Sequence, residues 1–102
     1  MSEAMSREDV ERAAGDLPGW AVADGALVKE LRFSGFDQAF AFLTRVAMLA
    51  EKRGHHPDFS CAYDSVRLEL RSHDAGGVTE RDVELARAIE GLLAAPLSPR
   101  RA

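Results

Sequence analysis

The spacing of apolar and polar positions predicts three helices, of which the first and the last have clear start signals. Ser6 precedes two acidic residues in the manner of a near capping box, and Gly15 with the Pro18-Gly19 pair ends that helix. Thr79 and Asp82 have capping-box spacing at the start of the last helix. Apolar residues recur at helical spacing in both segments: Val10, Ala13, Ala14 and Leu17 in the first, and Leu85, Ala86, Ile89, Leu92 and Leu93 in the last.

The longest predicted helix covers residues 36–53. The Ser34-to-Asp37 sequence resembles a capping box at its start, and Gly54 followed by Pro57 predicts its end. Glu51 continues an inward-facing row at the last turn. Because the helix is apolar around much of its circumference, we expect one stripe to pack on the sheet and the other to contact a second subunit. The stripes are Phe36, Phe40, Leu43, Ala47 and Ala50, and Phe42, Val46 and Leu49.

Four shorter segments alternate like strands, in two pairs. Asp24-Gly25 predicts a two-residue hairpin turn in the first pair, since glycine tolerates a positive φ. Asp64-Ser65 is the predicted turn of the second pair. Phe59 and Tyr63 are interpreted as sheet and core residues. The predicted strands are residues 20–23, 26–33, 59–63 and 66–73.

The resulting element order, α-β-β-α-β-β-α, predicts an α+β fold. Two hairpins can form a four-stranded antiparallel sheet, and the three helices would cover one face of it. The chain has 102 residues, so we expect a single domain over residues 1–102, with a frayed tail over residues 96–102.

Composition narrows the possible functions. The net charge of −4 disfavours a nucleic-acid-binding surface as the main function. No apolar run approaches the roughly 20 residues that span a bilayer, and the N-terminus lacks the apolar core of a secretory signal. One cysteine, Cys61, has no partner for an internal disulfide. We therefore expect a soluble cytoplasmic protein.

Residues 51–82 contain every histidine of the chain. The unperturbed pKa of histidine, about 6.5, lets its ring give or take a proton near neutral pH. Carboxylates in the same window could orient each ring. The window therefore predicts a proton-transfer site in which three rings converge on one pocket. Its histidines are His55, His56 and His73, and its flanking acids include Glu51, Asp74 and Asp82.

Histidines and acidic residues in one window are also compatible with other roles. Clustered histidines can be surface or hydrogen-bonded structural residues. A metal site is less favoured, because Gly54 breaks the helix between Glu51 and His55, and adjacent histidine rings tend to point apart. A nucleophile is weaker still, since Cys61 lies among apolar strand residues as a buried, inert thiol would. Ser72 beside a histidine does not make a triad. General acid–base work on a small molecule remains the leading interpretation.

The order of motifs in this window resembles that of the pterin-4a-carbinolamine dehydratase family. Glu-x-x-x-His-His-Pro begins at Glu51, and a strand with an aromatic residue and a tyrosine follows. Ser-His-Asp occupies residues 72–74, and Gly-Gly-Val-Thr-x-x-Asp ends at Asp82. The resemblance covers residues 51–90 closely, and the helix before them fits as well.

This resemblance implies an α+β enzyme that dehydrates 4a-hydroxytetrahydrobiopterin, or a related reduced pterin, to the quinonoid dihydropterin. The reaction recycles the pterin used by aromatic amino-acid hydroxylases and needs neither a metal nor an organic cofactor. The matched catalytic positions are His55, His56 and His73, and the supporting acids are Glu51 and Asp82. The positions expected to hold the pterin are Gly54, His56, Arg71, Ser72, His73 and Asp74.

Within that family-based interpretation, we expect His56 and His73 to act as the main acid–base pair, with His55 assisting. Strict alternation from Val66 places His73 on the face of its strand opposite Leu68, so it reaches a pocket only if that face or the strand end lines the site. The second apolar stripe of the long helix fits a subunit interface, and exposed strand edges could pair across it, so we expect a homodimer or homotetramer. The alternative function is a protein-interaction module, such as a transcriptional coactivator or an assembly factor, with a protein partner and no direct contact to nucleic acid or membrane.

Overall fold

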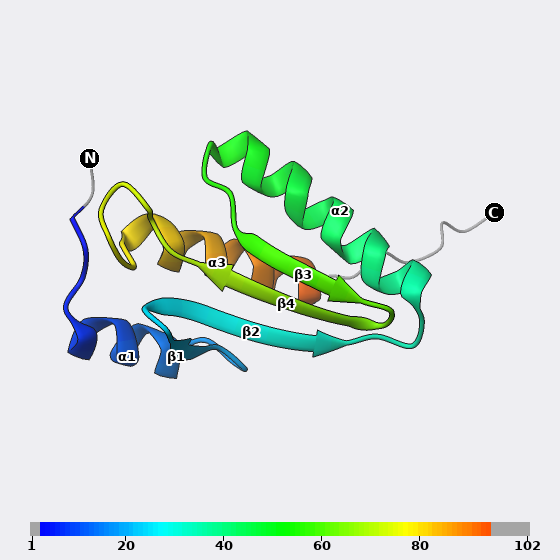
Figure 1. The fold of residues 1–102 in the computed structure, drawn as a ribbon, viewed down its shortest axis with the longest axis horizontal. Helices are drawn as coiled ribbons and strands as arrows, with labels where there is room; N and C mark the ends of the chain where they lie inside the picture. The colour runs from blue at the N-terminus through cyan, green and yellow to red at the C-terminus, as the bar shows by residue number, and fades with distance from the viewer. Residues whose placement is uncertain (1–2, 95–102) are drawn as a thin grey trace.

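The computed structural model describes residues 3–94, in which three helices and four strands follow one another in the predicted order (Figure 1). The predicted tail over residues 96–102 lies outside the described residues. The elements are α1 (Arg7–Gly15), β1 (Ala21–Ala23), β2 (Ala26–Arg32), α2 (Phe36–Arg53), β3 (Asp58–Ala62), β4 (Ser65–Leu70) and α3 (Glu80–Ala94).

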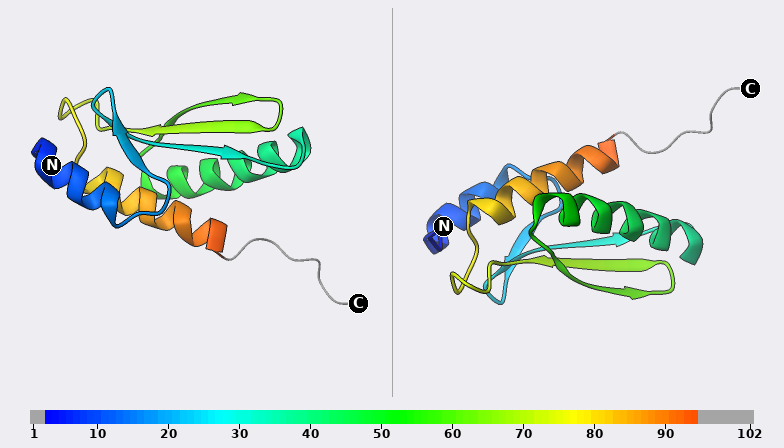
Figure 2. Two further views of the ribbon diagram at one scale, coloured as in Figure 1. Left: turned by 90° about the horizontal axis from the view of Figure 1, so that it is seen from below. Right: turned by 90° about the horizontal axis from the view of Figure 1, so that it is seen from above.

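The four strands form one antiparallel sheet in the order β1-β2-β4-β3. All three helices lie on the same face of this sheet, and within residues 3–94 no helix covers the other face (Figure 2). The predicted α+β fold, with helices on one face, is therefore confirmed. No helix within residues 3–94 is long and apolar enough to cross a membrane.

The core forms where alternate strand residues meet the helices. Val66, Leu68 and Leu70 point toward the helices from β4, and half-buried residues separate them along the strand. Leu27 lies opposite Leu70 in the register and shares the same face. Each such side chain contributes about 1.5–3 kcal/mol when fully buried. The fully enclosed apolar residues include Leu27, Leu68, Leu70, Leu85 and Ile89.

The helix ends follow local sequence signals with one exception. Ser6 caps α1, since its Oγ accepts a hydrogen bond from the Asp9 N–H at 3.2 Å. Gly54 ends α2 in the left-handed conformation, with φ of 66°. The capping box predicted around Ser34 is wrong. Gly35 is the N-cap of α2 and makes no side-chain cap bond.

The second hairpin differs from the prediction in its turn and in its length. Ala62 pairs with Ser65, so the turn residues are Tyr63 and Asp64 rather than Asp64 and Ser65. Tyr63 takes a positive φ of 57°. This register places Cys61 opposite Val66, which sets the inward face of both strands. Strand β4 ends at Leu70, and a single bridge between Ser72 and Gly77 follows where strand up to residue 73 was predicted.

Several apolar side chains near the edge strand β3 are more exposed than predicted. The side chains of Phe59 and Tyr63 are 59% and 72% exposed, so neither is a core residue in this chain. The thiol of Cys61 is half-buried rather than enclosed. Strand β3 has a neighbour on one side only, which leaves its residues uncovered. The expectation of two separate stripes on α2 also changes, because residues of both stripes are buried together with Ala39, which belongs to neither. The buried residues are Ala39, Phe42, Leu43, Val46 and Ala50.

A buried polar cluster joins β2 to α3. The Lys29 ammonium lies 2.6 Å from Glu90 Oε2 and donates to the Pro18 carbonyl at 2.7 Å. The Trp20 indole N–H donates to the same Glu90 oxygen at 2.7 Å. Lys29 is only 8% exposed, so its charge depends on these partners.

Candidate functional site

The three histidines lie in the two connections that meet at one end of the sheet. His55 and His56 directly follow the left-handed Gly54, which turns the chain away from α2. The His55 N–H donates to the Ala50 carbonyl at 3.1 Å, which ties this turn to the helix end. His73 lies beyond β4, in the loop that the bridge between Ser72 and Gly77 closes.

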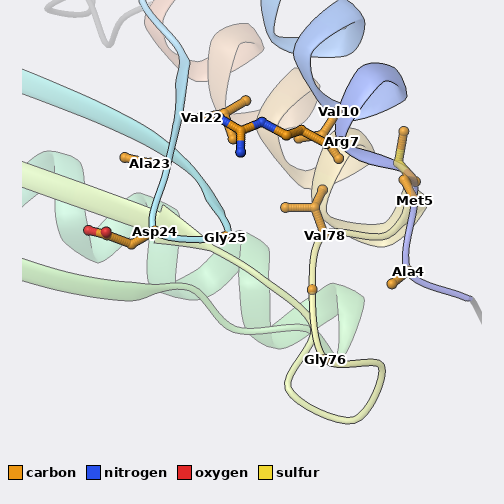
Figure 3. Close-up of a pocket in the computed structure, with 11 residues that line it drawn as sticks. Ala4, Met5, Arg7, Val10, Val22, Ala23, Asp24, Gly25, Gly76 and Val78 are labelled. Carbon is orange, nitrogen blue, oxygen red and sulfur yellow. The ribbon is translucent and has the colours of Figure 1, made fainter.

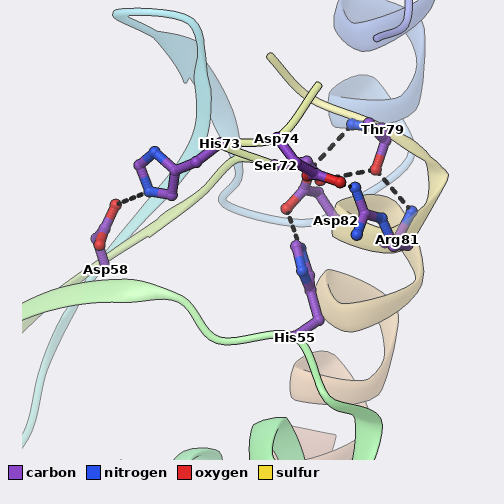
Figure 4. A network of polar contacts seen from close by, with 8 residues as sticks. All are labelled: His55, Asp58, Ser72, His73, Asp74, Thr79, Arg81 and Asp82. Carbon is purple, nitrogen blue, oxygen red and sulfur yellow. Dashed lines mark hydrogen bonds and ion pairs between the residues drawn. The ribbon is translucent and has the colours of Figure 1, made fainter. Parts of the chain in front are cut away.

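His55 and Asp82 form a buried pair (Figure 4). Nε2 of His55 lies 2.6 Å from Oδ1 of Asp82, and the two side chains are 13% and 0% exposed. The other carboxylate oxygen, Oδ2, accepts hydrogen bonds from the Ser72 hydroxyl at 2.8 Å and from the Thr79 N–H at 2.9 Å. This carboxylate therefore has a partner on each oxygen.

Local sequence explains why Asp82 lies here. It is the third residue of α3, so its carboxylate reaches back to the N–H of Thr79, as in a capping box. The N-terminus of a helix also stabilises negative charge. The capping role predicted for Asp82 is thus present, and the same carboxylate contacts His55 through its second oxygen.

The other two histidines pair with carboxylates at the surface. Nε2 of His56 lies 2.9 Å from Oε1 of Glu51, with side chains 63% and 80% exposed. The prediction that Glu51 faces inward is therefore wrong. Nε2 of His73 lies 3.3 Å from Oδ2 of Asp58, with side chains 72% and 55% exposed. Each histidine ring consequently has its own carboxylate.

The hollow beside His56 is not lined by the other two histidines. A hollow of about 220 Å³ between α2 and β3 is lined by Glu51, His56 and Phe59, but not by His55 or His73. The expectation that all three rings line one pocket does not hold for this hollow. His73 nevertheless contacts Asp58, two residues after His56, so its ring lies beside the segment that carries His56.

The remaining predicted substrate positions surround this end of the sheet. Gly54 caps α2, and the Arg71 guanidinium donates to Glu69 at 3.1 Å. Ser72 is 1% exposed, so its hydroxyl faces the interior rather than an open site. The Arg81 guanidinium donates to Asp74 at 2.8 Å, and this hydrogen bond lowers the pKa of the Asp74 carboxyl below its ordinary value.

Sequence reasoning missed two residues of this arrangement. Asp58 was not assigned a role, although it is the first residue of β3 and directly follows Pro57. Its place beside His73 depends on the pairing of Asp58 with Glu69 across β3 and β4. Thr79 was interpreted only as a helix cap, yet its hydroxyl lies 2.8 Å from the buried Ser72 hydroxyl.

Two further findings concern metal-binding groups and a second hollow. Within residues 3–94, no group of three or more histidine, cysteine or acidic side chains is placed to hold a metal ion. A separate hollow of about 390 Å³ lies between the start of α1, the β1–β2 turn and the loop before α3 (Figure 3). Its lining includes Arg7, Val22 and Val78, and none of the three histidines.

Comparison with known proteins identifies the family. A family model described as pterin 4 alpha carbinolamine dehydratase matches residues 3–92. A relative from Rhodopseudomonas palustris (strain BisB18) is 46% identical over 102 residues, which is 98% of this chain and 100% of the relative. Its name, pterin-4-alpha-carbinolamine dehydratase, is provisional. The chain belongs to the pterin-4a-carbinolamine dehydratase family.

Two solved structures share the fold. One is a crystal structure described as a transcriptional coactivator/pterin dehydratase from Brucella melitensis, with a TM-score of 0.83 and 33% sequence identity. The match covers 88% of this chain and 98% of the Brucella chain. The other is a pterin dehydratase-like protein described as a RuBisCO assembly factor in the alpha-carboxysome, with a TM-score of 0.60 and 24% sequence identity. The match covers 76% of this chain and 89% of the assembly-factor chain. The second likeness shows the fold alone.

Proposed function

We propose that this protein dehydrates 4a-hydroxytetrahydrobiopterin, or a related reduced pterin, to the quinonoid dihydropterin. Membership of the family supports this assignment, and the matched histidines supply the required proton-transfer groups. The observation that carries the proposal is the pairing of His55 with Asp82, His56 with Glu51 and His73 with Asp58. A carboxylate beside each ring favours a defined orientation for acid–base catalysis.

The reaction removes one water molecule from the pterin. A proton must be delivered to the hydroxyl on carbon 4a as the C–O bond breaks, and a proton must leave ring nitrogen N5. His56 and His73 are exposed enough to contact a bound ring, and the contact of His73 with Asp58 holds it near the His56 segment. His55, which is paired with the buried Asp82, assists these two histidines in the proton transfers. Each positioned proton transfer contributes on the order of 10²–10⁴-fold to the rate.

A direct assay tests this assignment. Stopped-flow absorbance would follow dehydration of freshly generated 4a-hydroxytetrahydropterin with the unmodified protein and with His56→Ala and His73→Ala. We expect each substitution to lower kcat by roughly 10²-fold or more. Lys52→Ala serves as the matched control, since Lys52 is an exposed neighbour of Glu51 outside the proposed site. Full activity in both histidine variants would refute the proposed mechanism, and inactive unmodified protein would refute the function.

We further propose that the protein acts in the cytoplasm, as a homodimer or homotetramer, in recycling the pterin of aromatic amino-acid hydroxylases. Exposed aromatic residues on α2 and β3 support self-association: Phe36, Phe40 and Phe59 are 51%, 55% and 59% exposed. Contiguous exposed apolar side chains mark interaction sites, and the ring centroids of Phe36 and Phe40 lie 5.7 Å apart. Light scattering after gel filtration should give a multiple of the chain mass. Phe40→Glu should reduce that mass, whereas Lys52→Glu should not.

A further inference from the structure

The hydroxyls behind Asp82 form a hydrogen-bond chain that can run in only one direction. The Ser72 hydroxyl donates its single hydrogen to Asp82 Oδ2 at 2.8 Å, so it can only accept from Thr79 Oγ1, which lies 2.8 Å away. Thr79 Oγ1 in turn accepts from the Arg81 N–H at 3.2 Å. The chain therefore runs from Arg81 through Thr79 and Ser72 to the carboxylate (Figure 4).

This direction determines the form of the His55 ring. Asp82 Oδ2 accepts from both the Ser72 hydroxyl and the Thr79 N–H, and the helix N-terminus favours the ionised carboxylate. An ionised carboxylate can only accept hydrogen bonds. Oδ1, 2.6 Å from Nε2 of His55, therefore requires a hydrogen on Nε2. In the neutral ring, the lone pair is then on Nδ1.

The free nitrogen is accessible. Within residues 3–94, the buried side-chain nitrogens and oxygens without a hydrogen-bond partner are Nε of Arg71 and Nε of Arg81. Nδ1 of His55 also has no partner in those residues, yet it is not one of these buried atoms, so it reaches solvent. It can accept a proton without breaking an existing contact.

We propose that Ser72 and Thr79 are positioning residues that fix His55 as the Nε2–H tautomer. This tautomer leaves Nδ1 as the nitrogen that takes part in proton transfer with the pterin. This inference rests on the proposed dehydratase function. It replaces the predicted substrate contact of the Ser72 hydroxyl, which is buried and fully engaged with Asp82 and Thr79.

The tautomer can be measured without substrate. In ¹⁵N spectra of ring-labelled protein at alkaline pH, with His55 assigned by the signal that is lost in His55→Gln, we expect a protonated Nε2 and a bare Nδ1. A bare Nε2 with a protonated Nδ1 would overturn the inference. Because no pterin is present, this result is separate from the dehydratase assay that tests the proposed function.

Asp82→Asn gives a sharper test. The Ser72 hydroxyl and the Thr79 N–H both donate at the Oδ2 position, so the asparagine oxygen must sit there and its NH₂ must face His55. We expect the tautomer to invert, with hydrogen on Nδ1, and kcat to fall by roughly 10²-fold. Asp58→Asn is the matched control, because Asp58 pairs with a different histidine and should leave the His55 spectrum unchanged. An unchanged tautomer in folded Asp82→Asn would contradict the inference.

Ser72→Ala tests the positioning role without removing His55 or Asp82. We expect kcat to fall about tenfold, the factor associated with one hydrogen bond to a charged group, while KM stays unchanged. Thr79→Ser keeps the hydroxyl and should retain the unmodified kcat, whereas Thr79→Val should resemble Ser72→Ala. Unchanged kcat in folded Ser72→Ala, or equal loss in Thr79→Ser and Thr79→Val, would overturn the role of the hydroxyl chain.

Discussion

The buried pair of His55 with Asp82 differs from the exposed pairs of His56 and His73 in how its geometry is maintained. Asp82 is fully enclosed and has hydrogen-bond partners on both oxygens, so its position is fixed by the fold. Glu51 and Asp58 are 80% and 55% exposed, and their pairs lie in water and salt. Exposed ion pairs contribute little and are screened at physiological ionic strength.

This difference separates two tasks within one proposed site. The buried carboxylate can set the orientation of a ring before any substrate arrives, as preorganised catalysis requires. The exposed pairs orient His56 and His73 more weakly, because both lie in water, and we expect contacts with a bound molecule to complete the geometry of these rings. The three matched histidines are therefore expected to respond differently when their carboxylates are removed.

The largest expected effect is on the buried side of this comparison. Asp82→Ala would leave the Ser72 hydroxyl and the Thr79 N–H without their buried acceptor and His55 without its partner. We expect the free energy of unfolding to fall by about 3 kcal/mol, measured by urea denaturation. A loss no larger than that of a surface substitution would mean that enclosure does not maintain this pair.

A second buried network distinguishes stability from activity. Lys29→Met would leave Glu90 with the Trp20 indole as its remaining partner. We expect a loss of about 2 kcal/mol in unfolding free energy. Glu90 lies eight residues beyond Asp82, about 12 Å along α3, so kcat for dehydration should be retained. A large fall in kcat at unchanged fold would show that the two networks are coupled.

The exposed pairs should contribute little to the free energy of unfolding, in contrast to the buried pair. Glu51→Ala and Asp58→Ala remove acceptors that are largely in water. Their unfolding free energies should stay within about 0.5 kcal/mol of the unmodified protein. The same urea titrations provide the measurement, and a loss comparable to that of Asp82→Ala in either variant would remove the distinction between the buried and exposed pairs.

The smallest expected effect concerns Asp74. The hydrogen bond from Arg81 lowers the pKa of this carboxyl, so the pair stabilises the fold above the unfolded pKa and is lost as pH falls through the folded one. Arg81→Gln should return the pKa of Asp74 upward toward its ordinary value, as followed by carboxyl ¹³C shifts during acid titration. Arg67→Gln should leave that titration unchanged, because the pKa of Arg67 is raised by Glu69 and Glu30 instead.

Most of the fold could be predicted because its signals are local. The apolar period of α2 and the left-handed glycine at its end are readable from neighbouring residues. The same holds for the first hairpin, where Asp24 and Gly25 take positive φ as the turn requires. The second turn was misplaced because Asp64 favours turns at more than one position, and the pairing of Cys61 with Val66 decides the register.

The sequence by itself determined the order of elements, the α+β class and the set of histidines, because periodicity, turn residues and motif spacing are properties of neighbouring positions. Only the tertiary structure decided which carboxylate serves which ring. His55 meets Asp82 across 27 positions of the chain, and His73 meets Asp58 through strand pairing. Burial, which makes the first pair rigid and leaves the second in water, depends on how helices and strands pack.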